Sequence, residues 1–226
     1  MVIVGVRLPC FRLAAALRHN LDPDTMAFLI ERTGRRRVLE STDAAARAGV
    51  RPGMALREAT RLAPGAAVAL DDPVRAERAW RRVLDVLAVL PAGLDDGGPG
   101  LAFLRLPHGD IAERWFGRVR ERLAPSGLAV RCGAGSNRFV AYAATHRTAD
   151  AVCRPGGEAA FVADAPLELL CADDDVLLRL RLLGVTTLGR LAALPLPYLR
   201  RFGSDALRWH ELAHGQDEPA AVAGVW

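Results

Sequence analysis

The sequence contains no lysine, so its 30 basic residues are all arginines, and 26 acidic residues leave a formal net charge of +4. Alanine, glycine, proline and arginine are all abundant, a bias that favours a GC-rich genome as the explanation. The positive charge also suits a polyanionic partner, because each contact between a guanidinium and a phosphate releases counterions. Composition therefore permits nucleic-acid binding without requiring it.

Long apolar runs and paired cysteines are missing too. No apolar run approaches the roughly 18 residues of a membrane-spanning helix, and nothing resembles a signal peptide, so we expect a cytoplasmic protein without membrane contact. The four cysteines form no Cys-x-x-Cys pair, so neither a zinc site nor a disulfide framework is indicated. We expect them to be buried thiols: Cys10, Cys132, Cys153 and Cys171.

Aromatic residues make up only 6% of the chain, and none are arranged as a row on which nucleic-acid bases could stack. We expect the larger ones to fill the hydrophobic core: Trp80, Trp115, Phe116, Phe139 and Phe161.

Carboxylates are missing where the first strand ends. Val2–Val6 reads as a buried strand that leads into a helix at Ala14–Leu17. Enzymes of phosphoryl transfer hold metal ions with carboxylates placed after such a strand. This strand ends instead in Arg7 and Pro9.

The remaining pattern predicts an α/β unit with a small inserted subdomain, followed by a helical region from Pro166 onward. Asp95 and Asp96 fall in a predicted turn, and Asp110 is expected to cap a helix. The predicted strands are 26–31, 37–40, 67–70, 101–106 and 127–132. The predicted helices are 44–48, 54–62, 74–90, 111–123, 138–146, 176–183, 188–193, 198–202 and 205–214.

Four stretches together resemble the Y-family (translesion) DNA polymerases. Ala46–Met54 with Arg61–Pro64 is similar to their fingers signature, and Leu128–Ala141 to a palm strand with its following helix. Leu182–Leu191 is similar to the helix–turn–helix of their thumb. Leu199–Gly203 with Gly215–Asp217 most resembles the ImuB branch, a polymerase-like accessory protein of mutagenic repair.

The resemblance implies an α/β palm with inserted fingers, followed by an all-α thumb related to helix-hairpin-helix units, without the little finger of the family. The implied palm is 1–21 and 71–165, the fingers are 22–70, and the thumb is 166–226. Longer relatives continue into a further DNA-gripping domain and a clamp-binding tail, so we expect this chain to be a shortened form.

The family binds two Mg²⁺ ions through three carboxylates, and the resemblance places other residues at those positions. They are Arg7, Pro9, Gly100 and Leu101. A guanidinium repels Mg²⁺, so the resemblance predicts no metal, no cofactor, no catalytic residue and a protein that is not an enzyme.

The nucleotide-binding positions of the family also carry unusual residues, namely Asp43, Ala46 and Tyr142, with Arg12 where the family excludes ribonucleotides. Asp173–Asp175 falls where the family holds a DNA phosphate, and acids there are expected to cap a helix instead. The expected DNA contacts lie in the thumb: Thr186, Thr187, Gly189, Arg190, Arg200 and Arg201.

A rival motif is His210-Glu-Leu-Ala-His214, which matches the zinc-protease pattern His-Glu-x-x-His. A third ligand is expected downstream, where the only further carboxylates are Asp217 and Glu218. We expect instead a weak, sequence-independent partner of primer–template DNA that also meets other repair proteins. The alternatives are an interaction module without DNA affinity, an active error-prone polymerase, and a zinc hydrolase.

Overall fold

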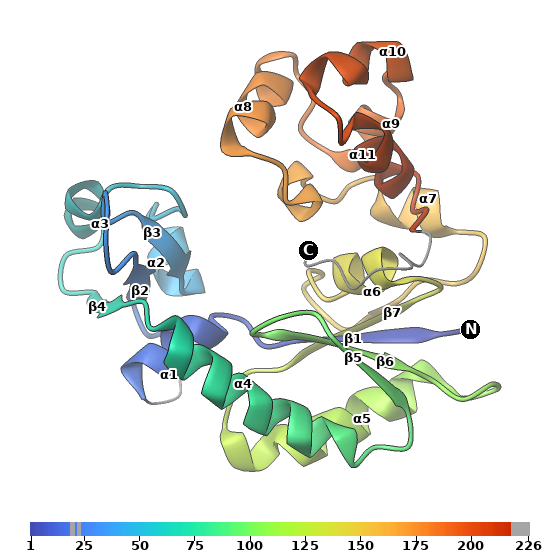
Figure 1. Ribbon diagram of the computed structural model, residues 1–226, viewed down its shortest axis with the longest axis horizontal. Coiled ribbons are helices and arrows are strands. Elements are labelled where there is room, and N and C mark those ends of the chain that lie inside the picture. The colour runs from blue at the N-terminus through green and yellow to red at the C-terminus, as the bar shows by residue number, and fades with distance from the viewer. Residues whose placement is uncertain (19–20, 22–23, 218–226) are drawn as a thin grey trace.

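The computed structural model describes residues 1–18, 21 and 24–217. A five-stranded sheet lies at the centre, a small inserted unit lies at one end of it, and a helical unit lies above it (Figure 1). Glu218, the carboxylate noted downstream of the zinc-protease pattern, falls outside the described residues.

The central sheet is built around the first strand, as the apolar opening of the chain predicts. β1 lies between β6 and β7 and is antiparallel to both. In sheet order the strands are β5 (Gly93–Asp96), β6 (Leu101–Arg105), β1 (Ile3–Arg7), β7 (Arg131–Gly135) and β8 (Ala151–Val152).

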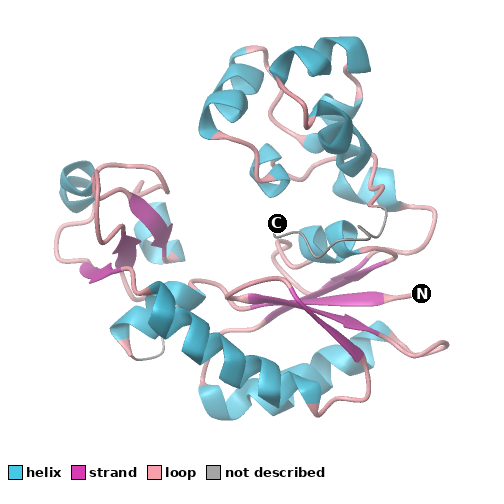
Figure 2. Cartoon of the chain, viewed as in Figure 1, coloured by secondary structure: helices cyan, strands magenta, loops and turns pink. Residues whose placement is uncertain are grey.

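Helices cover both faces of this sheet (Figure 2). α4 (Pro73–Ala88) and α5 (Ala112–Leu123) bury Trp80 and Trp115 against one face, together with Val4 and Val6 of β1. α6 (Arg138–Ala144) covers the other face. Burying the two indole rings removes a large apolar area from water, which stabilises this layer.

β7 begins and ends later than the predicted strand 127–132, because Gly133 and Gly135 belong to the strand and not to a turn. A Cβ on Gly133 would lie 2.5 Å from Ala144, and one on Gly135 would lie 2.6 Å from Val140. Both glycines therefore allow α6 to pack directly on the backbone of β7.

The turn predicted around Asp95 and Asp96 is in part the edge strand β5. Asp95 forms ion pairs with Arg105 and Arg138, at 3.2 and 3.8 Å. Asp96 Oδ1 accepts hydrogen bonds from Trp80 Nε1 and the Gly98 N–H, so its role at the turn is confirmed. The predicted cap at Asp110 is wrong, because its carboxylate accepts from Trp115 Nε1 and makes no cap to α5.

The inserted unit has a second sheet, in which β2 pairs antiparallel with β3 and parallel with β4. The predicted strands 26–31 and 37–40 pair with each other as β2 and β3. Thr42 Oγ1 caps α2 by accepting from the Ala45 N–H. Its elements are β2 (Ala27–Ile30), β3 (Val38–Ser41), α2 (Asp43–Arg47), α3 (Leu56–Leu62) and β4 (Ala67–Leu70).

The joint between the inserted unit and the central sheet is formed by α1 (Phe11–Leu17) and the chain after β4. Arg12 forms an ion pair with the largely buried Asp71 at 2.5 Å. The Leu13 N–H donates to Glu40 Oε2, while burial raises the pKa of the Glu40 carboxyl. These contacts connect α1 with β3 and with the residue after β4.

The helical unit packs its core against α6 through Phe139, Val140 and Ala143. Asp174 and Asp175 lie in the first turn of α8, where the helix dipole favours acids, although Asp173 makes no side-chain cap. Its helices are α7 (Glu158–Val162), α8 (Asp174–Leu182), α9 (Leu188–Ala192), α10 (Leu196–Leu199) and α11 (Ala206–Ala213). Short 3₁₀ turns lie at Ala124–Ser126, Leu167–Leu170 and Arg200–Phe202.

The boundaries of palm, fingers and thumb stay predictions. None of the described helices combines the length and apolar character that crossing a membrane requires.

Candidate nucleic-acid interface

The residues at the predicted metal positions lie together at one end of the central sheet. Arg7 stands directly opposite Leu101 in the register of β1 and β6. The Leu8 N–H donates to the carbonyl of Gly100 at 2.8 Å. Pro9 follows and lines the same cavity as Arg7.

These residues do not fit a pair of Mg²⁺ ions. The half-buried Arg7 guanidinium donates to Thr145 Oγ1 at 3.2 Å and to the Thr145 carbonyl at 3.1 Å. Gly100 has a φ of +97°, and a Cβ there would lie 3.0 Å from Phe11 Cβ. In the part of the chain that the structure describes, no group of three His, Cys, Asp or Glu side chains could hold a metal ion.

The cavity beside Arg7 has a volume of about 350 Å³ and lies between the central sheet and the inserted unit. Arg131 of β7 also lines it and stands directly opposite Arg7 in the strand register. Arg147 lines it too, but its guanidinium makes a double hydrogen bond to Asp164. Sequence reasoning missed Arg131, because its position opposite Arg7 depends on the register between two strands far apart in the sequence.

The remaining titratable groups of the cavity wall add little positive charge at neutral pH. Desolvation, with a further contribution from Arg7, lowers the pKa of His146 to about 4. Burial raises the pKa of the Cys10 thiol to about 12. The cavity charge therefore comes from the arginines and from the exposed carboxylate of Asp43.

The predicted nucleotide positions are divided between two elements. Asp43 and Ala46 lie on α2, and Asp43 lines the cavity. Tyr142 lies on α6 and packs edge-on against His146, with ring centroids 4.7 Å apart. Burial raises the pKa of Tyr142 to about 12, so its hydroxyl stays neutral.

The turn between α8 and α9 and the first residues of α9 contain four of the predicted DNA contacts. Thr186 is exposed, and Thr187 caps α9 by accepting from the Arg190 N–H. Arg190 Nη1 donates to the Gly184 carbonyl at 2.7 Å. Gly189 packs α9 on the chain after α7, because its N–H donates to the Ala163 carbonyl at 2.8 Å.

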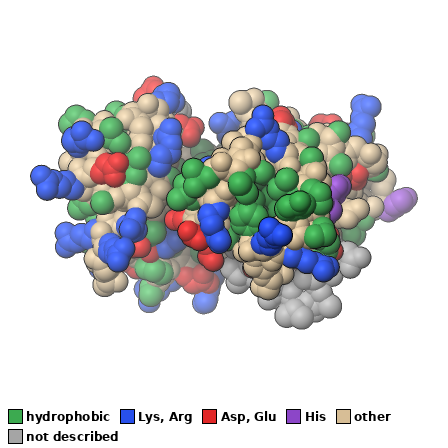
Figure 3. Space-filling model, turned by 90° about the horizontal axis from the view of Figure 1, so that it is seen from above, with side chains coloured by type: hydrophobic (Ala, Val, Ile, Leu, Met, Phe, Trp, Pro, Cys, Tyr) green, Lys and Arg blue, Asp and Glu red, His purple; other side chains and the backbone are tan. Residues whose placement is uncertain are grey.

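The other two predicted contacts follow α10. Arg200 and Arg201 are exposed, and the Arg201 guanidinium lies 5.4 Å from the ring centre of Tyr198. Positive side chains spread over the inserted unit and the thumb on the face seen in Figure 3. All six thumb contacts stay predictions.

The rival zinc motif lies at the end of α11. The rings of His210 and His214 are 4.5 Å apart, and His214 Nδ1 lies 2.8 Å from the His210 carbonyl oxygen. That contact occupies Nδ1 of His214 at the end of the helix, so this ring nitrogen is not available to a metal ion.

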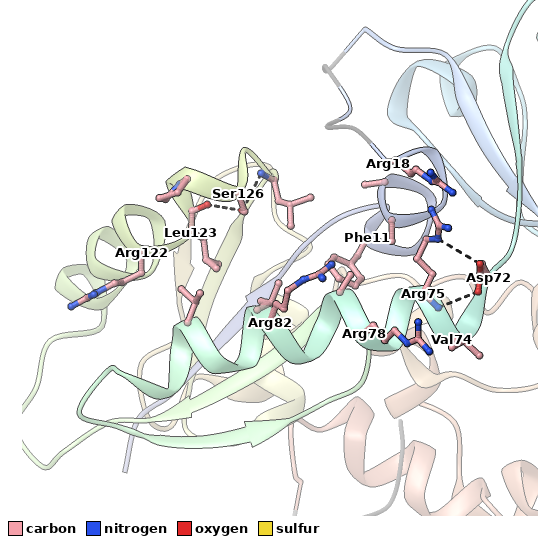
Figure 4. A pocket seen from close by; sticks show the side chains of 17 residues that line it. Phe11, Arg18, Asp72, Val74, Arg75, Arg78, Arg82, Arg122, Leu123 and Ser126 are labelled. Carbon is pink, nitrogen blue, oxygen red and sulfur yellow. Dashed lines mark hydrogen bonds and ion pairs between the residues drawn. The ribbon is translucent and has the colours of Figure 1, made fainter.

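A second basic hollow, the back groove, lies between α1, α4 and the end of α5 and has a volume of about 750 Å³ (Figure 4). Its floor is apolar, with Phe11, Val83 and Leu123. Asp72 is the one carboxylate among the described residues that line it, and its Oδ2 lies 3.5 Å from Arg75 Nε. Its arginines are Arg18, Arg75, Arg78, Arg82 and Arg122.

Comparison with known proteins identifies the family. A sequence profile of the impB/mucB/samB family matches residues 8–146. A protein named DNA polymerase IV from Caulobacter vibrioides is 29% identical to this chain. The alignment, gaps included, is 228 residues long and covers 93% of this chain. The chain spans about half of that relative, 55% of its length.

Solved structures show the same fold. DinB from Sulfolobus solfataricus matches with a TM-score of 0.75 and 19% identity over 97% of this chain and 69% of its own. An insertion ternary complex of Dbh DNA polymerase matches with a TM-score of 0.73 and 19% identity, at the same coverage.

These relatives contradict the prediction that the chain is not an enzyme. The relative that aligns with most of this chain is named a DNA polymerase. The unusual residues at the metal positions therefore do not separate the chain from a family that contains enzymes. The chain belongs to the impB/mucB/samB family and has the core fold of the Y-family DNA polymerases.

Proposed function

We propose that this protein takes part in translesion DNA repair as an ImuB-like accessory protein, holding primer–template DNA through its phosphates. The family and the fold support a role in repair. Neighbours solved as ternary and binary complexes of a DNA polymerase support DNA as the partner. Contacts to phosphates make such binding independent of base sequence.

One observation about the thumb carries the proposal. Arg179, Arg181 and Arg208 each form an ion pair with a carboxylate of the same unit. Among the described residues, no ion pair joins a carboxylate to the three thumb arginines predicted to contact DNA, which are Arg190, Arg200 and Arg201. Their exposed guanidinium groups are available for phosphates, which they can bind through two parallel hydrogen bonds.

The test is fluorescence anisotropy of a labelled primer–template between about 50 and 200 mM salt. We expect affinity to fall steeply with salt, because bound arginines release counterions. Replacing Arg190, Arg200 and Arg201 with glutamine should flatten the slope of log affinity against log salt by about two to three.

A matched control removes the same charge from α4, on the opposite side of the central sheet, through Arg75, Arg78 and Arg82 (Figure 1). This variant should keep the slope of the unaltered protein. Equal losses in both variants would contradict specific contact by the thumb. Primer extension, measured in the same samples with deoxynucleotides and Mg²⁺, would contradict the accessory role and show nucleotide addition.

The second candidate is an interaction module without DNA affinity. Three leucines of the thumb favour it, because Leu178, Leu182 and Leu183 are 53%, 77% and 67% exposed. Exposed apolar clusters of this kind mark surfaces that contact other proteins. Absence of DNA binding at about 50 mM salt would support this candidate over the first.

A further inference from the structure

Two arginines are held side by side in the central sheet. Arg7 and Arg131 are direct partners in the antiparallel register of β1 and β7, so their side chains leave the same face of the sheet. Directly opposed side chains on paired strands lie about 5 Å apart at Cβ, where like charges destabilise the sheet. Arg131 also contributes to lowering the pKa of the Arg7 guanidinium, after the larger effect of burial.

No described carboxylate is paired with either of these two arginines. Arg7 donates to Thr145, and Arg131 Nη1 donates to the Thr148 carbonyl at 3.1 Å. Two nearby arginines do form ion pairs with carboxylates, Arg147 with Asp164 and Arg120 with Asp150. In the described part of the chain, two positive charges therefore stand together at a cavity, and no carboxylate forms an ion pair with either of them.

We propose that Arg7 and Arg131 form an anion site that binds the phosphates of a polyphosphate directly, without a divalent cation. An anion between the two guanidinium groups removes their repulsion and replaces water lost by the half-buried Arg7. The anion site is formed by residues of the cavity, and it does not depend on the thumb contacts of the proposed function.

The chemistry of the wall selects phosphate. A guanidinium offers paired N–H donors that match phosphate oxygens, and two such groups can share one diphosphate. The volume of about 350 Å³ lies within the range of small-ligand pockets. Asp43 is the one described carboxylate that lines the cavity, and it limits how much negative charge the site can accept.

The test is thermal unfolding of the full chain in EDTA, with sodium pyrophosphate at about 5 mM against sodium chloride of equal ionic strength. We expect pyrophosphate to raise the melting temperature of the unaltered protein. Arg7→Met and Arg131→Met should each weaken the affinity, measured by calorimetry, by roughly tenfold to hundredfold. Asp43→Asn should strengthen it, because it removes the negative charge of the one described carboxylate that lines the cavity.

Arg78→Met is the matched control, since it removes an exposed arginine from the back groove and should leave the pyrophosphate shift unchanged. If Arg7 only stabilised the fold, Arg7→Met would lower the melting temperature. If Arg7 belongs to the anion site, Arg7→Met in the absence of anion should melt at a higher temperature than the unaltered protein, and pyrophosphate should not change that temperature.

Further arms identify the source of the phosphate. A deoxynucleoside triphosphate in EDTA should match or exceed pyrophosphate, and a short single-stranded oligonucleotide should not compete with it. Competition by the oligonucleotide would assign the site to the DNA backbone and overturn a free polyphosphate. Equal pyrophosphate shifts in all variants, or no shift in the unaltered protein, would overturn the site, whatever the thumb variants show in DNA binding.

Discussion

The cavity beside Arg7 and the back groove both gather arginines, but they hold them in different ways. In the cavity, Arg7 and Arg131 project from paired strands, so the backbone hydrogen bonds of the sheet fix their spacing. In the back groove the arginines stand on helix surfaces, and all except Arg75 are exposed. Water and salt screen exposed charges strongly, whereas a half-buried charge keeps most of its field.

This difference teaches that the number of arginines is a poor guide to a binding site. The back groove has five arginines and the larger volume, but long, exposed side chains lose conformational entropy when they are ordered on a ligand. In the cavity, Arg7 and Arg131 have no described carboxylate partner, and the sheet fixes their backbone positions, while the Arg7 side chain is also half-buried and bonded to Thr145. Preorganised charge of this kind binds an anion at lower cost.

The largest expected effect tests how rigidly the backbone defines the cavity. Gly100→Asp should destabilise the protein by about 2 to 4 kcal/mol, since it combines a left-handed φ with contacts near 3 Å to Phe11 and the Leu8 carbonyl. Chemical unfolding measures the loss. Gly98→Asp is the control, because Gly98 has a similar φ of +94° but open space around a Cβ.

Gly98→Asp should therefore cost only about 1 to 2 kcal/mol, the penalty of the backbone conformation. Equal losses at the two glycines would show that the backbone beside Arg7 adjusts easily. The claim that a carboxylate residue does not fit at position 100 would then fail.

The next prediction concerns how completely the sheet beside the two arginines is buried from water. Cys132 follows Arg131 on β7, and burial raises its pKa from 9.0 to about 12. Above pH 9 the unfolded chain releases this proton while the folded chain retains it, so stability must fall as pH rises from about 9 to 12.

The slope from this one group approaches about 1.4 kcal/mol per pH unit. Chemical unfolding between about pH 8 and 10.5 should show it, and Cys132→Ala should have a shallower slope although it is less stable at pH 8. An unchanged slope in the variant would mean that the thiol ionises in the folded protein.

Much of the central fold could be predicted because its signals are local. The apolar run of β1 follows from neighbouring residues, and the structure confirms that strand. The glycines of β7 carry an ambiguous signal, since Gly133 and Gly135 suit a turn as well as a close helix contact. Only the packing of α6 decides between the two.

The candidate site was less accessible to sequence reasoning. The structure places Arg7, Gly100 and Leu101 close together, and their identification with the metal positions of the family stays a prediction. Arg131 could not be recognised, because its meaning depends on a strand register between residues more than a hundred positions apart. Edge strand β5 was missed because Leu94 is its one large apolar residue, and Gly93, Asp95 and Asp96 are typical of a turn.

The smallest expected effect is the change in stability when one arginine of the cavity or of the back groove loses its charge. Without added anion, Arg7→Met should raise the free energy of unfolding by about 0.5 to 1 kcal/mol, since it removes the repulsion from Arg131. Arg78→Met in the back groove should change it by less than about 0.5 kcal/mol, because exposed, screened charges contribute little. High salt should reduce the stabilising effect of Arg7→Met, since the charge that repels Arg7 is on the exposed side chain of Arg131, where salt screens it. A stabilising effect of the same size at both positions would mean that net charge, and not the paired geometry of the cavity, sets the energy of its arginines.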